Sequence, residues 1–112
     1  MTASTCTNDG PPFRPCTEEA RAGLNVSVSL GSMSSITSDG VTVIVTDGAY
    51  NETLTTPFEN DPVFSGAYER IGNYVITVSK EGYQTYTTET IVVGRDRCHV
   101  IPRIVHVSLL PL

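Results

Sequence analysis

Alternation of apolar and polar residues is the strongest pattern in this chain. Between residues 24 and 30 every second residue is Leu or Val, and those between them are Asn or Ser. A period of two places apolar side chains on one face of an extended strand and polar ones on the other. We therefore predict a half-buried strand whose core face carries Leu24, Val26, Val28 and Leu30.

Two later segments repeat this pattern and predict strands over 41–46 and 73–79. Asp47-Gly48 follows the first of them and favours a turn. The side chains predicted to face the core are Val41, Val43, Val45, Tyr74, Ile76 and Val78.

The remaining segments are less regular. Residues 49–62 contain two prolines and are expected to form at most a short edge strand. Strands are also predicted over 63–69, over the Thr-rich segment 83–93, and over 98–110. Pro102 interrupts the last of these and implies a bulge or an edge position, because proline has no N–H for a sheet hydrogen bond.

Composition supports an all-β fold of one domain. Val, Ile and Thr, whose branched side chains favour strands, make up 35 of 112 residues. Six to seven strands with turn residues between them are typical of a single, mostly antiparallel β-sandwich over residues 16–112. A small closed barrel is the alternative. The Thr-, Asn-, Gly- and Pro-rich residues 1–15 are predicted to be a flexible leader.

Charge and hydropathy exclude two classes of partner. Seven Lys and Arg residues against twelve Asp and Glu residues give a net charge of −5, and no basic run is present. Proteins that bind nucleic acids need clustered positive charge, so this chain is not expected to bind a nucleic acid. No stretch of 18 apolar residues occurs in the sequence, so no membrane span is predicted.

The cysteine count is odd, and the spacing is too wide for a zinc knuckle or a redox pair. Cys16 lies at the start of the first ordered segment and Cys98 opens the last predicted strand, which favours a Cys16–Cys98 disulfide formed outside the cytoplasm. Three free thiols, or a Cys6–Cys16 bond, are the alternatives. If a signal peptide precedes this segment, Cys6 is a candidate for lipidation in a bacterial lipoprotein.

A family resemblance rests on Gly72-Asn73-Tyr74, which enters an alternating strand, and on Gly82-Tyr83 after the next turn. With Asp39-Gly40 before the strand at 41–46, this pattern resembles the carboxypeptidase regulatory-like domains. Those domains imply a transthyretin-like, immunoglobulin-like sandwich without catalytic activity. The resemblance implies that Gly72 adopts a positive φ and that Tyr74 forms a tyrosine corner, with its ring buried and its hydroxyl bound to the backbone or to water. The segments around Cys16 and Cys98 resemble a secreted or lipoprotein branch in which the two cysteines pair.

Several residues could carry chemistry, and each has a plainer interpretation. His99 and His106 could ligate a metal, but they are expected to be strand-surface residues. Asp47, Glu59 and Asp61 could gather around Ca²⁺ or remain solvated charges.

Aromatic residues of the middle loop are the other candidates. Tyr50, Phe58 and Phe64 could form a stacking surface for a carbohydrate, although Phe58 and Phe64 could instead close one end of the sandwich. We expect no catalytic activity and no cofactor. The expected function is a structural or protein-interaction module, secreted or attached to a cell envelope. A carbohydrate-binding module is the first alternative, and a small metal-dependent enzyme is the second.

Overall fold

The computed structural model describes residue 16 and residues 19–32, 35–57 and 61–112. Within these ranges all regular secondary structure is β, as predicted. The strands are β1 (Ala22–Leu30), β2 (Thr42–Asp47), β3 (Tyr50–Thr53), β4 (Phe64–Tyr68), β5 (Gly72–Ser79), β6 (Tyr86–Thr87), β7 (Ile91–Val93) and β8 (Arg103–Leu109). The predicted leader, 1–15, lies outside the described residues.

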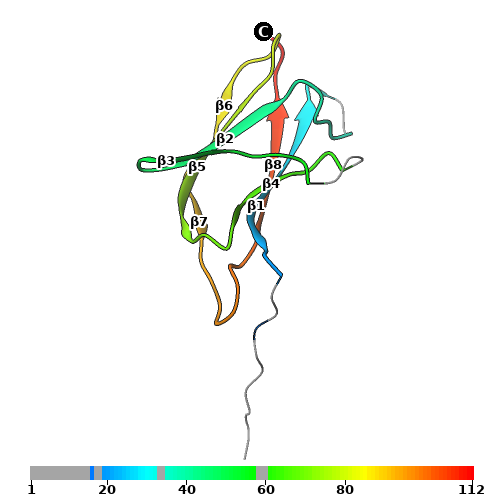
Figure 1. The fold of residues 1–112 in the computed structure, drawn as a ribbon. Helices are drawn as coiled ribbons and strands as arrows, with labels where there is room; N and C mark the ends of the chain where they lie inside the picture. Colours follow the sequence, from blue (N-terminus) through cyan, green and yellow to red (C-terminus); the bar gives the residue numbers. More distant parts are fainter. Residues whose placement is uncertain (1–15, 17–18, 33–34, 58–60) are drawn as a thin grey trace, which may run out of the picture.

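The strands form a β-sandwich of two sheets (Figure 1). One sheet has the order β4-β1-β8, and the other has the order β3-β2-β5-β6, with β7 also paired to β5. Strand pairing is antiparallel except between β1 and β8, whose arrowheads point the same way in Figure 1. The fold class predicted from the sequence is therefore confirmed.

The core lies between the inner faces of the sheets, where the alternating apolar residues meet. Burying these side chains is the main term that stabilises the fold. Leu30 and Val41 pack on the margin of the core. The other predicted core residues are fully buried: Leu24, Val26, Val28, Val43, Val45, Tyr74, Ile76 and Val78.

The prediction of one long strand over 83–93 is wrong, because this segment forms two short strands, β6 and β7. The interruption falls at Thr88. Its hydroxyl accepts the N–H of Ile76 at 3.1 Å, while its own N–H donates to the Ile76 carbonyl at 2.9 Å. A side-chain oxygen thus replaces a backbone carbonyl in the ladder, which breaks the regular pairing with β5.

The last strand is shorter than predicted. It begins at Arg103, directly after Pro102, and residues 98–102 are not part of it. Arg95 and Val100 form an isolated bridge, so the chain turns back on itself before Pro102. β8 lies at the edge of its sheet. Of the two alternatives that Pro102 indicated, a bulge or an edge strand, the structure shows the edge strand.

Candidate functional site

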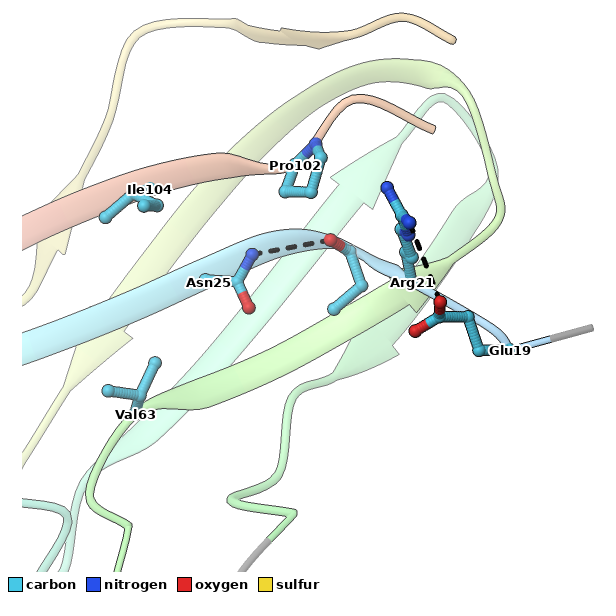
Figure 2. Close-up of a pocket in the computed structure, with 7 residues that line it drawn as sticks. Glu19, Arg21, Asn25, Val63, Pro102 and Ile104 are labelled. Carbon is cyan, nitrogen blue, oxygen red and sulfur yellow. Dashed lines mark hydrogen bonds and ion pairs between the residues drawn. The ribbon is translucent and has the colours of Figure 1, made fainter. Parts of the chain in front are cut away.

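The groove on the outer face of the β4-β1-β8 sheet has a volume of about 560 Å³ (Figure 2). It lies where β1 begins and reaches across all three strands to the residues just before β4 and β8. The side chain of Ile104 is 85% exposed beside it. The lining residues are Glu19, Arg21, Ala22, Asn25, Val63, Pro102 and Ile104.

Asn25 fixes the floor of this groove. Its side-chain amide donates to the carbonyls of Ala22 at 3.3 Å and Arg103 at 3.4 Å, and its oxygen accepts the Ser65 hydroxyl at 3.1 Å. The first of these bonds is drawn in Figure 2. Because one side chain ties β1 to both of its neighbours, the groove is held in a defined shape. Its apolar lining, Ala22, Val63, Pro102 and Ile104, suits an apolar side chain of a partner.

A line of hydroxyls and one imidazole follows the same face further along β1 and β8. The Nδ1 atom of His106 lies 3.0 Å from the Ser27 hydroxyl, and its Nε2 atom lies 3.0 Å from the Ser29 hydroxyl. His106 is exposed as predicted, whereas Ser29 is buried although its position in the alternation predicts an outward side chain. β8 covers it, because Ser29 contacts both His106 and Ser108.

The distances between His106 and the hydroxyls of Ser27 and Ser29 would suit a nucleophile and its base, but the rest of the arrangement would not. Nucleophilic catalysis needs a base oriented by a third group and donors for the developing oxyanion. Here both ring nitrogens are bound to hydroxyls of the neighbouring strand. The arrangement holds the imidazole over β1 and joins two strands that are far apart in the sequence.

His99, by contrast, is not a surface residue, and the expectation that it lies on a strand surface is wrong. It is 6% exposed, and its Nδ1 atom lies 2.6 Å from a carboxylate oxygen of Glu69. An ionised carboxylate only accepts hydrogen bonds, so Nδ1 carries the hydrogen and donates it. Among the described residues, no group of three or more His, Cys, Asp and Glu side chains gathers as a metal site.

Glu69 joins three segments at this end of the sandwich. Besides His99, it accepts the backbone N–H groups of Arg21 at 2.9 Å and Val100 at 3.1 Å. The Arg21 hydrogen bond is the main cause that lowers the pKa of Glu69, and the bonds from His99 and Val100 act in the same direction. Glu69 has a φ of 53°, in the left-handed region. Nothing in the sequence points to this role, since Glu69 is the last residue of the predicted strand over 63–69.

Asp96 caps the turn that carries Cys98 and His99. Its carboxylate accepts the N–H of Cys98 at 2.8 Å and the N–H of His99 at 2.9 Å. Donation from the His99 backbone, followed by that from Cys98, lowers the pKa of Asp96. Two carboxylates therefore stabilise the 94–100 segment in their ionised forms.

Acid should destabilise the fold through these two carboxylates. Their pKa values are lower in the folded chain than in the unfolded chain, so the folded state binds fewer protons in that range. The stabilisation is present above about pH 4 and is lost as the pH falls through the folded-state values. Urea unfolding measured from pH 6 to pH 2.5 should show this decline, and Glu69→Gln should flatten it. Glu81→Gln, on an exposed turn, is the control; an unchanged acid slope in Glu69→Gln would contradict the assignment.

The turn between β4 and β5 is held by a cluster around Arg70. Its guanidinium lies 3.6 Å above the ring of Tyr50, and its Nη1 donates to Asp47 at 3.0 Å and to the Tyr74 hydroxyl at 2.9 Å. The bond to Tyr74 is the main cause that raises the pKa of Arg70. The hydroxyl of Tyr50 donates to Glu52 at 2.6 Å, and this bond, with burial as the next cause, raises the pKa of Tyr50 to about 12.

Tyr74 forms the tyrosine corner that the family resemblance implied. Its ring is fully buried, and its hydroxyl donates to the carbonyl of Arg70 at 2.9 Å. The implied positive φ of Gly72 is wrong, since the positive-φ glycines of the described chain lie elsewhere. Gly72 is instead needed for space: a Cβ atom there would lie 2.5 Å from Asp47 Oδ2 and 3.1 Å from Tyr74 Cζ.

Two of the three aromatic residues proposed as a stacking surface lie in the described chain, and the fold engages both of them. Phe64 is 5% exposed and belongs to the core, as the plainer interpretation had it, and Arg70 covers one face of the Tyr50 ring. Phe58 lies outside the described residues. Phe64 therefore presents no ring for stacking on a sugar, and one face of the Tyr50 ring is already occupied by Arg70.

Of the three proposed calcium ligands, Asp47 and Asp61 lie in the described chain, and each is engaged in a contact of its own. Asp47 is paired with Arg70, and Asp61 accepts the N–H of Val63 at 3.0 Å in a local turn. Glu59 lies outside the described residues. The Oδ2 atom of Asp47 is therefore already bound to a guanidinium.

The cysteine pair favoured from the sequence is present. Cys16 and Cys98 are bonded, with 5.2 Å between their Cα atoms. The bond ties the chain just before β1 to the turn capped by Asp96. Cys6, the candidate for lipidation, lies outside the described residues.

A scan against protein-family models and a search of curated proteins both return no match. Among the described residues no helix is long and apolar enough to cross a membrane.

Proposed function

We propose that this domain is a non-catalytic protein-interaction module that acts outside the cytoplasm. We also propose that the domain is a member of the carboxypeptidase regulatory-like family. The single observation that carries it is the groove beside Ile104, because this apolar surface is held rigidly on an otherwise polar sheet face. Partner proteins bind such surfaces through apolar side chains surrounded by a polar rim, and Glu19, Arg21 and Asn25 supply that rim.

The disulfide supports an extracytoplasmic location. Disulfides persist in secreted and periplasmic proteins, whereas the cytosol keeps thiols reduced. Secretion, or attachment to the envelope through a lipid on Cys6, is the finer part of the proposal. The polar clusters at Glu69 and Arg70 support a structural role, because their hydrogen bonds are made within the fold.

Site-specific photo-crosslinking tests the interaction surface. A benzophenone amino acid replaces Ile104 in one variant and Val92 in another, because Val92 is also exposed, at 54%, but lies on β7 of the other sheet. After illumination of cells that produce the protein, the variant at 104 should yield a discrete protein adduct, and the variant at 92 should not. Absence of an adduct at 104, or equal adducts at both positions, would contradict an interaction surface at this groove.

A further inference from the structure

β8 presents an open edge of main-chain groups. The carbonyl of Leu109 accepts the N–H of Gly31, and the carbonyl of Arg103 accepts the side-chain amide of Asn25, so the odd-numbered residues of β8 direct their carbonyls toward β1. Since successive residues of a strand alternate, Ile104, His106 and Ser108 direct their N–H and C=O groups away from β1. Within the described chain, no hydrogen bond reaches those six groups.

The other sheet edges are short or partly covered. β3, β6 and β7 have four, two and three residues, and the outer side of β4 is bridged to Thr55. β8 has seven residues in unbroken register with β1, without a bulge. Between Arg103 and the C-terminal residue it carries no lysine, arginine or carboxylate side chain. Natural proteins usually protect an edge strand with charges, bulges or prolines, so an edge of this kind is a ready site for strand pairing.

A two-fold axis at His106 makes this edge complementary to itself. In an antiparallel pair, Ile104 faces Ser108 of the second copy, and His106 faces its own counterpart. Each facing pair exchanges two hydrogen bonds, which gives about six in all, and every outward N–H and C=O of the three residues is satisfied.

The pairing also ends where the chain can no longer support it. In this register Pro102 faces Leu110. Pro102 has no N–H to donate, and the carbonyl of Leu110 that it would have reached already accepts the N–H of Gln84 at 2.8 Å. The Gln84 main chain therefore occupies the outer side of Leu110, so the pairing must end at Ile104 of one copy and Ser108 of the other, and the chain before Ile104 must turn away from the edge there.

Side chains on the outer face fit the same register. Ile104, 85% exposed, lies beside the small Ser108 of the second copy. The ring of His106 is held over β1 by Ser27 and Ser29, so it leans away from the approaching strand.

Space is available along this edge. A second groove, of about 200 Å³, lies between Gln84–Tyr86 and the side chains of Ser108 and Leu110. The neighbouring segment therefore covers the edge from Leu110 onward, where Gln84 is hydrogen-bonded, and leaves the edge over residues 104–108 without a hydrogen-bonded neighbour in the described chain.

We propose that the chain forms a two-fold dimer in which β8 pairs antiparallel with β8 of a second copy, centred on His106. The dimer joins two three-stranded sheets into one of six strands. The proposal rests on the interaction role proposed above and names a second copy of this chain as the partner.

A charge-swap experiment tests both the partner and the register. His106→Lys and His106→Glu each place like charges directly opposite on the axis, which disfavours pairing. Sedimentation velocity should show the wild type shifting with concentration from one chain of 12.1 kDa to a dimer. Each variant alone should dimerise at least about tenfold more weakly, whereas an equimolar mixture should recover a heterodimer, because Lys then faces Glu.

Matched controls separate pairing from folding. Thr53→Lys and Thr53→Glu change an exposed residue of another edge strand and should dimerise as the wild type does. Ile104→Pro removes an outward N–H without touching the β1 ladder and should also weaken the dimer, while circular dichroism shows a folded sheet.

Three outcomes would overturn the self-pairing: a wild type that stays monomeric at about 1 mM, His106 variants that dimerise as the wild type does, or a mixture that stays monomeric. A monomeric wild type combined with a photo-adduct of a different protein at position 104 would refute the dimer and leave the interaction role intact. An adduct at position 104 with twice the mass of the chain would support both the dimer and the interaction role.

Discussion

Replacing Tyr74 with alanine should lower the free energy of unfolding by about 3–5 kcal/mol, which is typical of large aromatic truncations in a core. The ring is fully buried and lies edge-on to Tyr50, with 6.4 Å between the ring centroids. Its hydroxyl both donates to the Arg70 carbonyl and accepts from the Arg70 guanidinium. The substitution therefore opens a cavity, leaves the Arg70 carbonyl without this donor, and removes one of the two acceptors of Arg70 Nη1, which keeps its bond to Asp47. For a domain of this size the loss is a large part of the total stability.

Tyr74→Phe separates the contribution of the buried ring from that of the hydroxyl. It keeps the ring and removes only the hydroxyl, so the loss should be about 1–3 kcal/mol. Tyr86→Ala, at a side chain 48% exposed, is the control and should change the stability by less than about 1 kcal/mol. Urea unfolding followed by circular dichroism measures all three variants. A loss below about 1 kcal/mol for Tyr74→Ala would mean that the tyrosine corner does not hold the turn.

The strands with strict alternation were predictable because their pattern has a single physical meaning. In 24–30 a shift of one residue would turn every apolar side chain to solvent, and in 41–46 and 73–79 it would turn out all the core side chains and bring in only Ile44 and Val75, so the sequence determines the face. The segment over 83–93 carries no such constraint, because its Thr-rich residues suit either face. There the hydroxyl of Thr88 competes with the backbone and breaks the strand, an outcome that depends on the position of Ile76 in β5.

The polar clusters could not be predicted, because their partners are far apart in the chain. His99 and Glu69 are separated by 30 residues, and His106 and Ser27 by 79. The second contact exists only because β8 lies parallel to β1, an arrangement that no turn between the two strands prescribes. The groove beside Ile104 arises from the same pairing, so its residues were also missed.

Gly72 shows how a resemblance can identify the right residue for the wrong reason. The motif implied a left-handed conformation, whereas the structure needs glycine there because Asp47, Arg70 and Tyr74 crowd the position of a side chain. The left-handed residues of this turn are Ala67 and Glu69. A glycine in a motif therefore indicates close packing as readily as an unusual backbone angle.

Removing the disulfide should have an effect of similar size to the loss of Tyr74. In the chain-entropy model, closing a loop whose ends are 82 residues apart stabilises the fold by about 4 kcal/mol. The double variant Cys16→Ser, Cys98→Ser should lose this amount in urea unfolding, and reductant should lower the stability of the wild type but not that of the double variant. Cys6→Ser is the control and should behave as the wild type. An equal loss in Cys6→Ser would mean that Cys6 takes part in the bond.

The loss should come from the unfolded chain and not from a changed native structure. The turn that carries Cys98 is held independently of the bond, by the Asp96 carboxylate on the N–H groups of Cys98 and His99 and by the contact between His99 and Glu69. Amide NMR spectra of the reduced and oxidised proteins should therefore differ near Cys16 and Cys98 but agree at Val100 and along β8. Widespread shifts across β8 on reduction would instead show that the disulfide shapes the sheet edge itself, because β8 follows this turn directly in the chain.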